Sequence, residues 1–333
     1  MVDHSDGITL AANKRLLLTA GRSHPDLANA VAAELGTELS PVSAYDFANG
    51  EIFVRFEESV RGCDVFILQS HTTPINQWIM EQLIMVDAAK RASARRVTVV
   101  APFLGYARQD KKHRGREPIT ARLMMDMFQA AGADRIMTLD LHTSQIQGFL
   151  NGPVDHLFAL PYLADHVRRN YDPANITVVS PDAGRVRVAE RWTDVLGTPL
   201  AIIHKRRDPD VPNQSKVLEV VGDVRDRLCV VVDDMIDTGG TIAKAAEALF
   251  DTGARDVVVA ATHGILSDPA AERLAASGIA EVIVTDTLPI ADDQRFEQLT
   301  ILSIAPLVAK AIHEVFTDGS VTSMFELSKA DIT

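Results

Sequence analysis

Val232-Asp233-Asp234-Met235-Ile236-Asp237-Thr238-Gly239-Gly240-Thr241 is the stretch of this chain that decides its fold. The apolar run Leu228–Val232 ends in two acids, and a third acid precedes a Thr-Gly-Gly-Thr turn that opens a helical pattern. Short Val/Ile/Leu runs alternating with helical patterns are typical of a parallel sheet with helices on both faces. Ligands of such sheets bind at the carboxyl ends of the strands. The stretch therefore predicts an α/β fold and a ligand-binding loop together.

The chemistry of this loop suits a sugar phosphate. Thr238, Gly239, Gly240 and Thr241 are expected to hold a phosphate, because the glycines let backbone N–H groups approach and a helix N-terminus adds about half a positive charge. Asp233 and Asp237 would repel a phosphate and are expected on the vicinal hydroxyls of a ribose. Asp234 is expected either to do the same or to help anchor a hydrated metal. The alternative is an ordinary strand–turn–helix connection, which would not need three acids at this point.

The alternation of strands and helices extends along the whole chain and occurs in two successive sets. One set of strands runs to about residue 155 and a second begins near Ile176. We therefore expect two similar lobes, over residues 8–155 and 156–305, followed by a C-terminal helix and tail over residues 306–325 that packs back on the first lobe. The expected strands are Leu16–Ala20, Val65–Gln69, Val97–Ala101, Ile136–Leu141, Ile176–Ser180, Leu200–His204, Leu228–Val232, Val257–Thr262, Val282–Thr285 and Ile301–Ile304, and the expected helices are Ile75–Arg91, Ala121–Ala131, Gly184–Leu196, Thr241–Thr252, Pro269–Ala276 and Pro306–Phe316.

Composition narrows the classes of function. The 333 residues are 47% hydrophobic and carry a formal net charge of -12. A nucleic-acid surface normally needs a basic excess, so nucleic acid is not expected as a partner. The two cysteines, Cys63 and Cys229, form no CxxC pattern, which fits a reducing compartment. We expect no signal peptide and no membrane span, and hence a cytoplasmic location.

Two further motifs identify a family. Gly105-Tyr106-Ala107-Arg108-Gln109-Asp110 and Thr138-Leu139-Asp140-Leu141-His142 accompany the loop at 232–241. Together they resemble the ribose-phosphate pyrophosphokinase family, whose lobes have the type I phosphoribosyltransferase-like fold, over about residues 16–325. The variants Phe47–Glu51 and Lys111–Glu117 are similar to actinobacterial members. The resemblance implies transfer of the β,γ-pyrophosphoryl group of Mg-ATP to the C1 hydroxyl of ribose 5-phosphate. The products are 5-phosphoribosyl 1-pyrophosphate, used in nucleotide, histidine and tryptophan synthesis, and AMP.

A basic run in an acidic chain is the first candidate for the nucleotide half of the site. Arg108, Lys111, Lys112, Arg114 and Arg116 fall within nine residues. The run could be a solvated loop, a nucleic-acid patch or a triphosphate site, in which positive groups offset phosphate charge. The resemblance implies that Arg108 and Gln109 bind ATP. It places the rest, including Arg114, in a regulatory loop at a subunit interface, where phosphate and ADP compete.

The triplet Asn49-Gly50-Glu51 precedes an alternating segment, Ile52–Phe56. Taken alone it is a turn. The resemblance implies that it contacts the adenine of ATP and is contributed by a neighbouring subunit. Many relatives have Asp where this chain has Asn49, whose side chain can still accept a hydrogen bond.

His142 and Asp182 each follow a predicted strand, where a site belongs. A lone histidine is more often a structural hydrogen bonder, and Mg²⁺ prefers oxygen ligands. The resemblance nevertheless implies that both residues bind the magnesium of Mg-ATP, with His142 acting partly through water.

Basic residues also close the strand Leu200–His204. Lys205-Arg206-Arg207 could be a solvated strand end. The resemblance implies a mobile catalytic loop in which Lys205 contacts the transferring phosphates and Arg207 the sugar phosphate. Near the end of the chain, Ser320, Thr322 and Ser323 are either a polar tail or the phosphate-binding turn of an allosteric site. The resemblance also implies a homohexamer with sites between subunits.

Two other functions share parts of this pattern. A phosphoribosyltransferase would have the loop at 233–241, but a single-lobe transferase needs neither a second lobe nor the stretch Arg108–Glu117. A catalytically silent regulatory subunit would lack catalytic positions or carry insertions near the mobile loop. Lys205, Arg207, His142 and Asp182 are all present, so the sequence favours an active enzyme.

Overall fold

The computed structural model describes residues 14–206 and 217–325. Their strands form two sheets, one parallel and one mostly parallel, and one hairpin. The first sheet has five strands, all parallel. In spatial order they are β1 (Leu16–Ala20), β4 (Asp64–Leu68), β5 (Arg96–Ala101), β6 (Arg135–Leu139) and β7 (Val154–Leu157). The sequence between β1 and β4 forms the antiparallel hairpin of β2 (Val42–Asp46) and β3 (Ile52–Phe56).

The second sheet has seven strands and is parallel except at one edge. The edge strand β10 (Val217–Val221) runs antiparallel to β9 (Leu200–Arg206). The remaining strands are β8 (Ile176–Ser180), β11 (Leu228–Ile236), β12 (Asp256–Gly264), β13 (Glu281–Thr285) and β14 (Leu299–Leu302), in that order.

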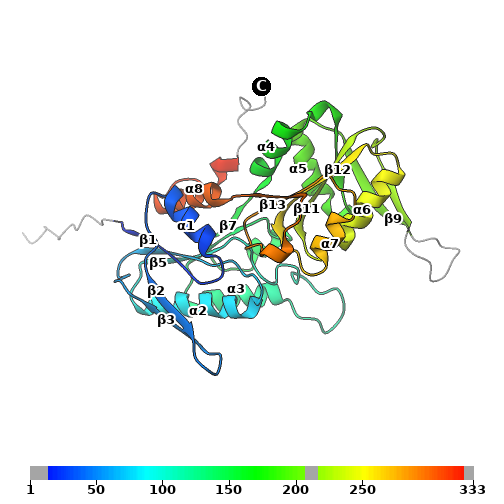
Figure 1. Ribbon diagram of the computed structural model, residues 1–333. Helices are drawn as coiled ribbons and strands as arrows, with labels where there is room; N and C mark the ends of the chain where they lie inside the picture. The colour runs from blue at the N-terminus through cyan, green and yellow to red at the C-terminus, as the bar shows by residue number, and fades with distance from the viewer. Residues whose placement is uncertain (1–13, 207–216, 326–333) are drawn as a thin grey trace, which may run out of the picture.

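Helices cover both faces of each sheet, because alternate residues of the buried strands are apolar on both sides. In β4, Val65 and Ile67 pack into the core under α2 and α3, whereas Phe66 and Leu68 pack into the core that contains α1 and α8. Figure 1 shows α8, near the end of the chain, lying beside α1, near its beginning. The helices are α1 (Pro25–Glu34), α2 (Ile75–Arg91), α3 (Thr120–Ala131), α4 (Leu160–Asn170), α5 (Val186–Leu196), α6 (Gly240–Asp251), α7 (Ala270–Ala275) and α8 (Ala305–Phe316).

The two lobes share one of their hydrophobic cores. Leu18 and Val31 of the first lobe belong to the same buried cluster as Val178 and Val230 of the second and Ile312 of α8. Polar contacts also cross between the lobes. The ring of His24 bonds the main-chain oxygen of Asp286 at 2.9 Å, and the Ser70 hydroxyl donates to that of Thr287 at 2.6 Å. The strand ends of the two sheets are therefore held in a fixed relation.

The predicted α/β fold with parallel sheets flanked by helices is confirmed, and β1, β8 and α2 have the predicted bounds. One strand differs in a way that matters for the site. β11 continues to Ile236, so Asp233 and Asp234 lie within the strand rather than after it, and Asp233 pairs with Ala261 of β12. The expected boundary at residue 155 cuts through β7, the edge strand of the first sheet. The helices α1 and α4 and the strands β2, β7 and β10 were not among the expected elements.

Within the residues that the structure describes, no helix is both long and apolar enough to span a bilayer.

Candidate active site

The phosphate loop, defined here as residues 237–241, joins β11 to α6. Gly239 is the N-cap of α6 and has φ +69°, a left-handed conformation that favours glycine. A Cβ at this position would also lie 3.1 Å from the side chain of Leu274. The Arg273 guanidinium donates to the main-chain oxygen of Thr238 and so holds the loop from α7. Because the first N–H groups of a helix have no intrahelical acceptor, this turn presents donors suited to an anion.

An acidic pair precedes the loop and is held by one arginine. Asp233 Oδ1 lies 3.0 Å from Nε of Arg185, and Asp234 Oδ1 lies 2.8 Å from Nη2 of the same residue. The second oxygen of Asp234 lies 2.9 Å from Nδ1 of His142, which comes from the first lobe. Asp234 is 6% exposed and Asp233 is 17% exposed. Asp234 is therefore occupied by protein partners, and Asp233 is the member of the pair that a ribose can reach.

The environments of these two carboxyl groups drive their pKa values apart. Burial, followed by the adjacent charge of Asp234, raises the pKa of Asp233 well above its usual range. Burial also acts to raise the pKa of Asp234, but the hydrogen bond with His142 and the charge of Arg185 outweigh burial and lower it. The pair thus holds its negative charge chiefly on Asp234, beside the arginine.

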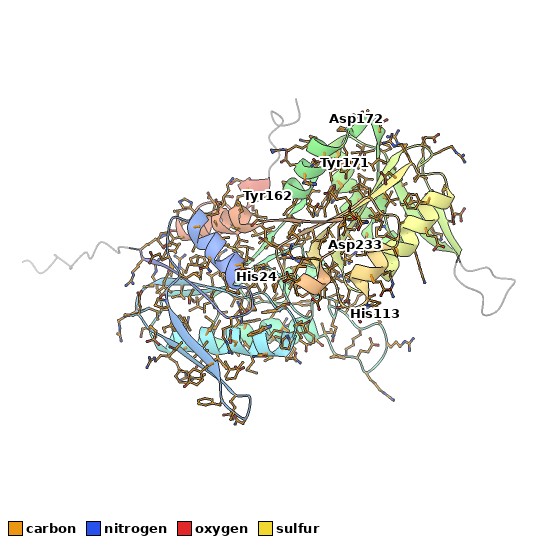
Figure 2. The ribbon with its side chains drawn as sticks, in the orientation of Figure 1. His24, His113, Tyr162, Tyr171, Asp172 and Asp233 are labelled. Atoms are coloured by element: carbon orange, nitrogen blue, oxygen red, sulfur yellow. The ribbon has the colours of Figure 1, made fainter. Side chains whose placement is uncertain are left out.

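The third acid reaches across to the first lobe. Asp237 Oδ2 lies 2.7 Å from Nη1 of Arg108. Burial acts to raise the pKa of Asp237, but hydrogen bonds from Ser267 and Arg108 outweigh it and lower the pKa. Arg108, Gln109 and Asp237 line one cavity of about 800 Å³, together with the aromatic side chains of Trp78 and Phe103. The Gln109 side-chain oxygen accepts a hydrogen bond from the Thr120 hydroxyl at 2.5 Å. Figure 2 shows Asp233 near the middle of the molecule and His113, of the same basic run as Arg108, on the loop below it.

The residues expected to bind magnesium fit a metal that takes few protein ligands. Asp182 follows β8, is partly buried, and uses Oδ1 to accept the N–H of Gly184 at 2.8 Å. The Nδ1 of His142 lies within hydrogen-bond distance of both Asp234 and Arg185 and can bond one of them at a time, which leaves Nε2 for a ligand. Among the described residues, no three His, Cys, Asp or Glu side chains form a group that could hold a metal. Mg²⁺ commonly uses one or two carboxylates with water and substrate phosphates, so a site shared with a nucleotide suits this arrangement.

The triplet 49–51 lies away from this cavity. It forms the tip of the β2–β3 hairpin, where Gly50 has φ +86° and the Asn49 side chain accepts the N–H of Glu51 at 3.2 Å. Gly50 and Glu51 line a separate groove of about 750 Å³ beside α2. A single chain thus does not bring the triplet to the cavity lined by Arg108 and Gln109.

The remaining predicted residues are placed in part. Lys205 lies in β9, where its backbone pairs with Leu218, and Arg207 lies outside the described residues. The Arg114 N–H donates to the Glu117 carboxylate at 2.9 Å within the basic loop. Ser320, Thr322 and Ser323 form an exposed turn near the end of the chain, and the Ser323 hydroxyl donates to the main-chain oxygen of Ser320 at 2.7 Å.

The sequence reasoning missed three residues: Ser267 and Arg273, which the structure brings to the phosphate loop, and Arg185, which it brings to the acidic pair before the loop. Arg185 follows β8, and the other two follow β12, so all three come from connections after strands that flank β11. The strand-end rule that pointed to Asp182 could have found them. Serine and arginine are common in loops, however, and these three residues are not part of a recognisable sequence motif.

Comparison with known proteins shows the family to which this chain belongs. A model described as the N-terminal domain of ribose phosphate pyrophosphokinase matches residues 16–132, and one described as a phosphoribosyl synthetase-associated domain matches residues 205–326. A protein of Streptomyces coelicolor named ribose-phosphate pyrophosphokinase is 63% identical over 320 residues, which are 96% of this chain and 99% of that protein. The chain belongs to the ribose-phosphate pyrophosphokinase family. It is an enzyme of that class, and the resemblance predicted from its motifs is confirmed.

Other members of the family support the same assignment. The Mycobacterium bovis ribose-phosphate pyrophosphokinase is 63% identical over 314 residues, covering 94% of this chain and 96% of that protein. A crystal structure of phosphoribosylpyrophosphate synthetase from Mycobacterium smegmatis superposes with a TM-score of 0.88 at 60% identity, covering 92% of this chain and all of that one. Both relatives are actinobacterial, as the motif variants predicted.

Proposed function

We propose that this chain transfers the β,γ-pyrophosphoryl group of Mg-ATP to the C1 hydroxyl of ribose 5-phosphate, giving 5-phosphoribosyl 1-pyrophosphate and AMP. The observation that carries the proposal is identity of about 60% over nearly the full length to enzymes named for this activity. The cavity supports it, since a cation proposed for ATP and a carboxylate proposed for the sugar both line it and form an ion pair with each other.

The ribose 5-phosphate is proposed to bind along the end of β11 and the start of α6. Thr238, Gly239, Gly240 and Thr241 offer backbone N–H groups and hydroxyls to the 5-phosphate. Asp233 and Asp237 accept hydrogen bonds from the sugar hydroxyls. Arg207 adds a positive charge to the phosphate end. The C1 hydroxyl is thereby held still for attack on the β-phosphorus, and positioning of this kind is a large part of catalysis in phosphoryl transfer.

The nucleotide is proposed to bind in the cavity of about 800 Å³. Arg108 and Gln109 hold ATP from the same chain, and Asn49, Gly50 and Glu51 of a neighbouring subunit contact the adenine. His142 and Asp182 would hold Mg²⁺, which neutralises charge on the phosphate oxygens when bound. Lys205 is proposed to contact the transferring phosphates most strongly in the transition state. We assign no side chain as a general base in this scheme.

The test is an assay of purified protein with ribose 5-phosphate and Mg-ATP, following AMP with and without inorganic phosphate. The expected result is AMP formation in step with consumption of ribose 5-phosphate. No AMP at any phosphate level would overturn the proposed function. Omitting ribose 5-phosphate is the control, because AMP formed without it would indicate hydrolysis rather than transfer.

The roles of the two lobes and the assembly of the subunits are part of the same proposal. Residues 8–155 carry the ATP and regulatory loops, residues 156–305 the ribose 5-phosphate loop, and residues 306–325 the C-terminal helix and tail. We expect a cytoplasmic homohexamer regulated by phosphate and ADP through Arg114, Ser320, Thr322 and Ser323. Sedimentation velocity tests the assembly. AMP formation that is equal with and without phosphate would contradict only the regulatory part.

A further inference from the structure

Arg185 contacts groups from both halves of the proposed site. It ends the short turn η3 (Ala183–Arg185) after β8, and its side chain is 15% exposed. Two of its nitrogens bond Asp233 and Asp234 of the second lobe, at 3.0 and 2.8 Å. Nη1 donates to the main-chain oxygen of His142 in the first lobe at 3.0 Å. All three guanidinium nitrogens are therefore engaged, each in a different direction.

The same arginine also restricts the imidazole of His142. Nδ1 lies 2.7 Å from Nη2 of Arg185 and 2.9 Å from Oδ2 of Asp234. One ring nitrogen cannot accept from a guanidinium and donate to a carboxylate at the same time. Either hydrogen bond uses Nδ1 and fixes the plane of the ring. In both cases Nε2 is the nitrogen left for a ligand.

We propose that Arg185 is a positioning residue of the reaction, which orients Asp233 for the ribose and His142 for the nucleotide. This inference rests on the proposed function. Arg185 need not touch the reacting atoms, because its effect passes through Asp233 and His142, which are proposed to hold the substrates in place. Only a planar guanidinium with several fixed donors can hold these acceptors together. An ammonium at this place keeps the charge but not the directions.

A purely structural tie between the lobes is the alternative. The lobes are also joined by His24 with Asp286, by Ser70 with Thr287, and by a common hydrophobic core. Because these contacts do not involve Arg185, the fold is expected to survive its replacement, whereas the alignment of the two substrates is not.

The experiment compares Arg185→Lys, Arg185→Ala and the charge-balanced double variant Arg185→Met with Asp234→Asn. We expect kcat to fall about 100-fold in all three, as for a misplacement of about 1 Å in a reacting group, while KM for each substrate changes little. Arg185→Ala leaves a buried carboxylate without its cation and should lower the melting temperature. The double variant should recover that temperature without recovering kcat. Arg169→Ala is the control, since Arg169 forms an exposed ion pair with Asp165 on α4.

The possible results separate three outcomes. Wild-type kcat in Arg185→Lys, or recovery of kcat together with melting temperature in the double variant, would overturn the positioning role while leaving the proposed function intact. If Arg185→Ala does not fold, the other two variants still decide the matter. A wild-type protein that forms no AMP would overturn the proposed function, and this inference with it.

Discussion

The guanidinium of Arg108 lies 2.7 Å from the carboxylate of Asp237, which is 129 residues further along the chain. The two residues come from different lobes and are proposed to bind different substrates. Their side chains are 54% and 30% exposed, and ion pairs this accessible contribute at most about 1 kcal/mol. Substrates can therefore displace the pair at little cost. Both side chains line the cavity of about 800 Å³, whereas Thr238, Gly240 and Thr241 line a separate cavity of about 930 Å³.

Replacing Asp237 with alanine should raise KM for ribose 5-phosphate much more than KM for ATP. The carboxylate is proposed to accept a hydrogen bond from the sugar, and its loss frees Arg108 rather than removing it. Steady-state kinetics with each substrate varied in turn measures the two constants. Asp126→Ala is the control, because Asp126 forms an exposed ion pair with Arg122 on α3. An equal rise in both KM values would contradict the role given to Asp237.

Replacing Lys205 with alanine should lower kcat about 10²- to 10³-fold, the usual effect of losing one group that stabilises transition-state charge. KM should change little, because a contact made mainly in the transition state does not contribute to substrate binding. Single-turnover measurements at saturating substrate would isolate the chemical step. Lys310→Ala, on the exposed side of α8, is the matched control. A large rise in KM with kcat unchanged would instead assign Lys205 to substrate binding.

Much of this fold could be predicted from the sequence, because buried parallel strands are continuous apolar runs that periodicity detects. The sequence did not predict some helices and strands whose apolar pattern is weak. β7 is a short edge strand with polar residues at Asp155 and His156, and α1 is rich in alanine, which gives a weak apolar stripe. β11 was predicted too short because its last residues include two acids, and a strand rule based on apolar character stops at the first of them.

The sequence could predict the candidate site only where its residues follow one another at a recognisable spacing in a single stretch of chain. The acids and glycines of 233–241 form such a pattern in one stretch of chain. Arg185, by contrast, matters because it contacts Asp233 and Asp234 of β11 and His142 from the connection after β6. No local sequence pattern indicates which of the many arginines will contact a buried carboxylate. That relation exists only once the sheets are assembled.

Replacing Leu249 with alanine should lower the free energy of unfolding by about 2–5 kcal/mol, the range for truncating a fully buried leucine. Leu249 is wholly buried in α6, the helix whose first turn forms the phosphate loop. Leu123→Ala is the matched control, since Leu123 lies in the equally long helix α3 but is 54% exposed. It should change stability by less than about 0.5 kcal/mol. Urea unfolding followed by circular dichroism compares the two variants, and similar losses in both would contradict the packing described here.

A buried histidine should make stability depend on pH. His71 is 1% exposed. Its Nδ1 accepts the N–H of Gly105 at 2.9 Å, so the ring proton must lie on Nε2, which donates to Gln82 at 2.8 Å. Burial lowers the pKa of His71 from 6.5 to about 4. The unfolded chain therefore binds a proton on this ring below about pH 6.5, whereas the folded chain does not until about pH 4.

Because the unfolded state binds more protons in that window, the free energy of unfolding falls as the pH is lowered from 6.5 to 4. A shift of this size corresponds to about 3 kcal/mol for one group.

His71→Asn keeps an acceptor near the Nδ1 position for Gly105 but has nothing to titrate. Its stability should be lower than that of the wild type at pH 7, and the difference should shrink toward pH 4. Urea midpoints across this range measure the difference directly. His156 and His263, whose pKa values are also lowered to about 4, are present in both proteins and add the same slope to each. Parallel curves for the two proteins would therefore show that His71 already carries its ordinary pKa in the folded chain.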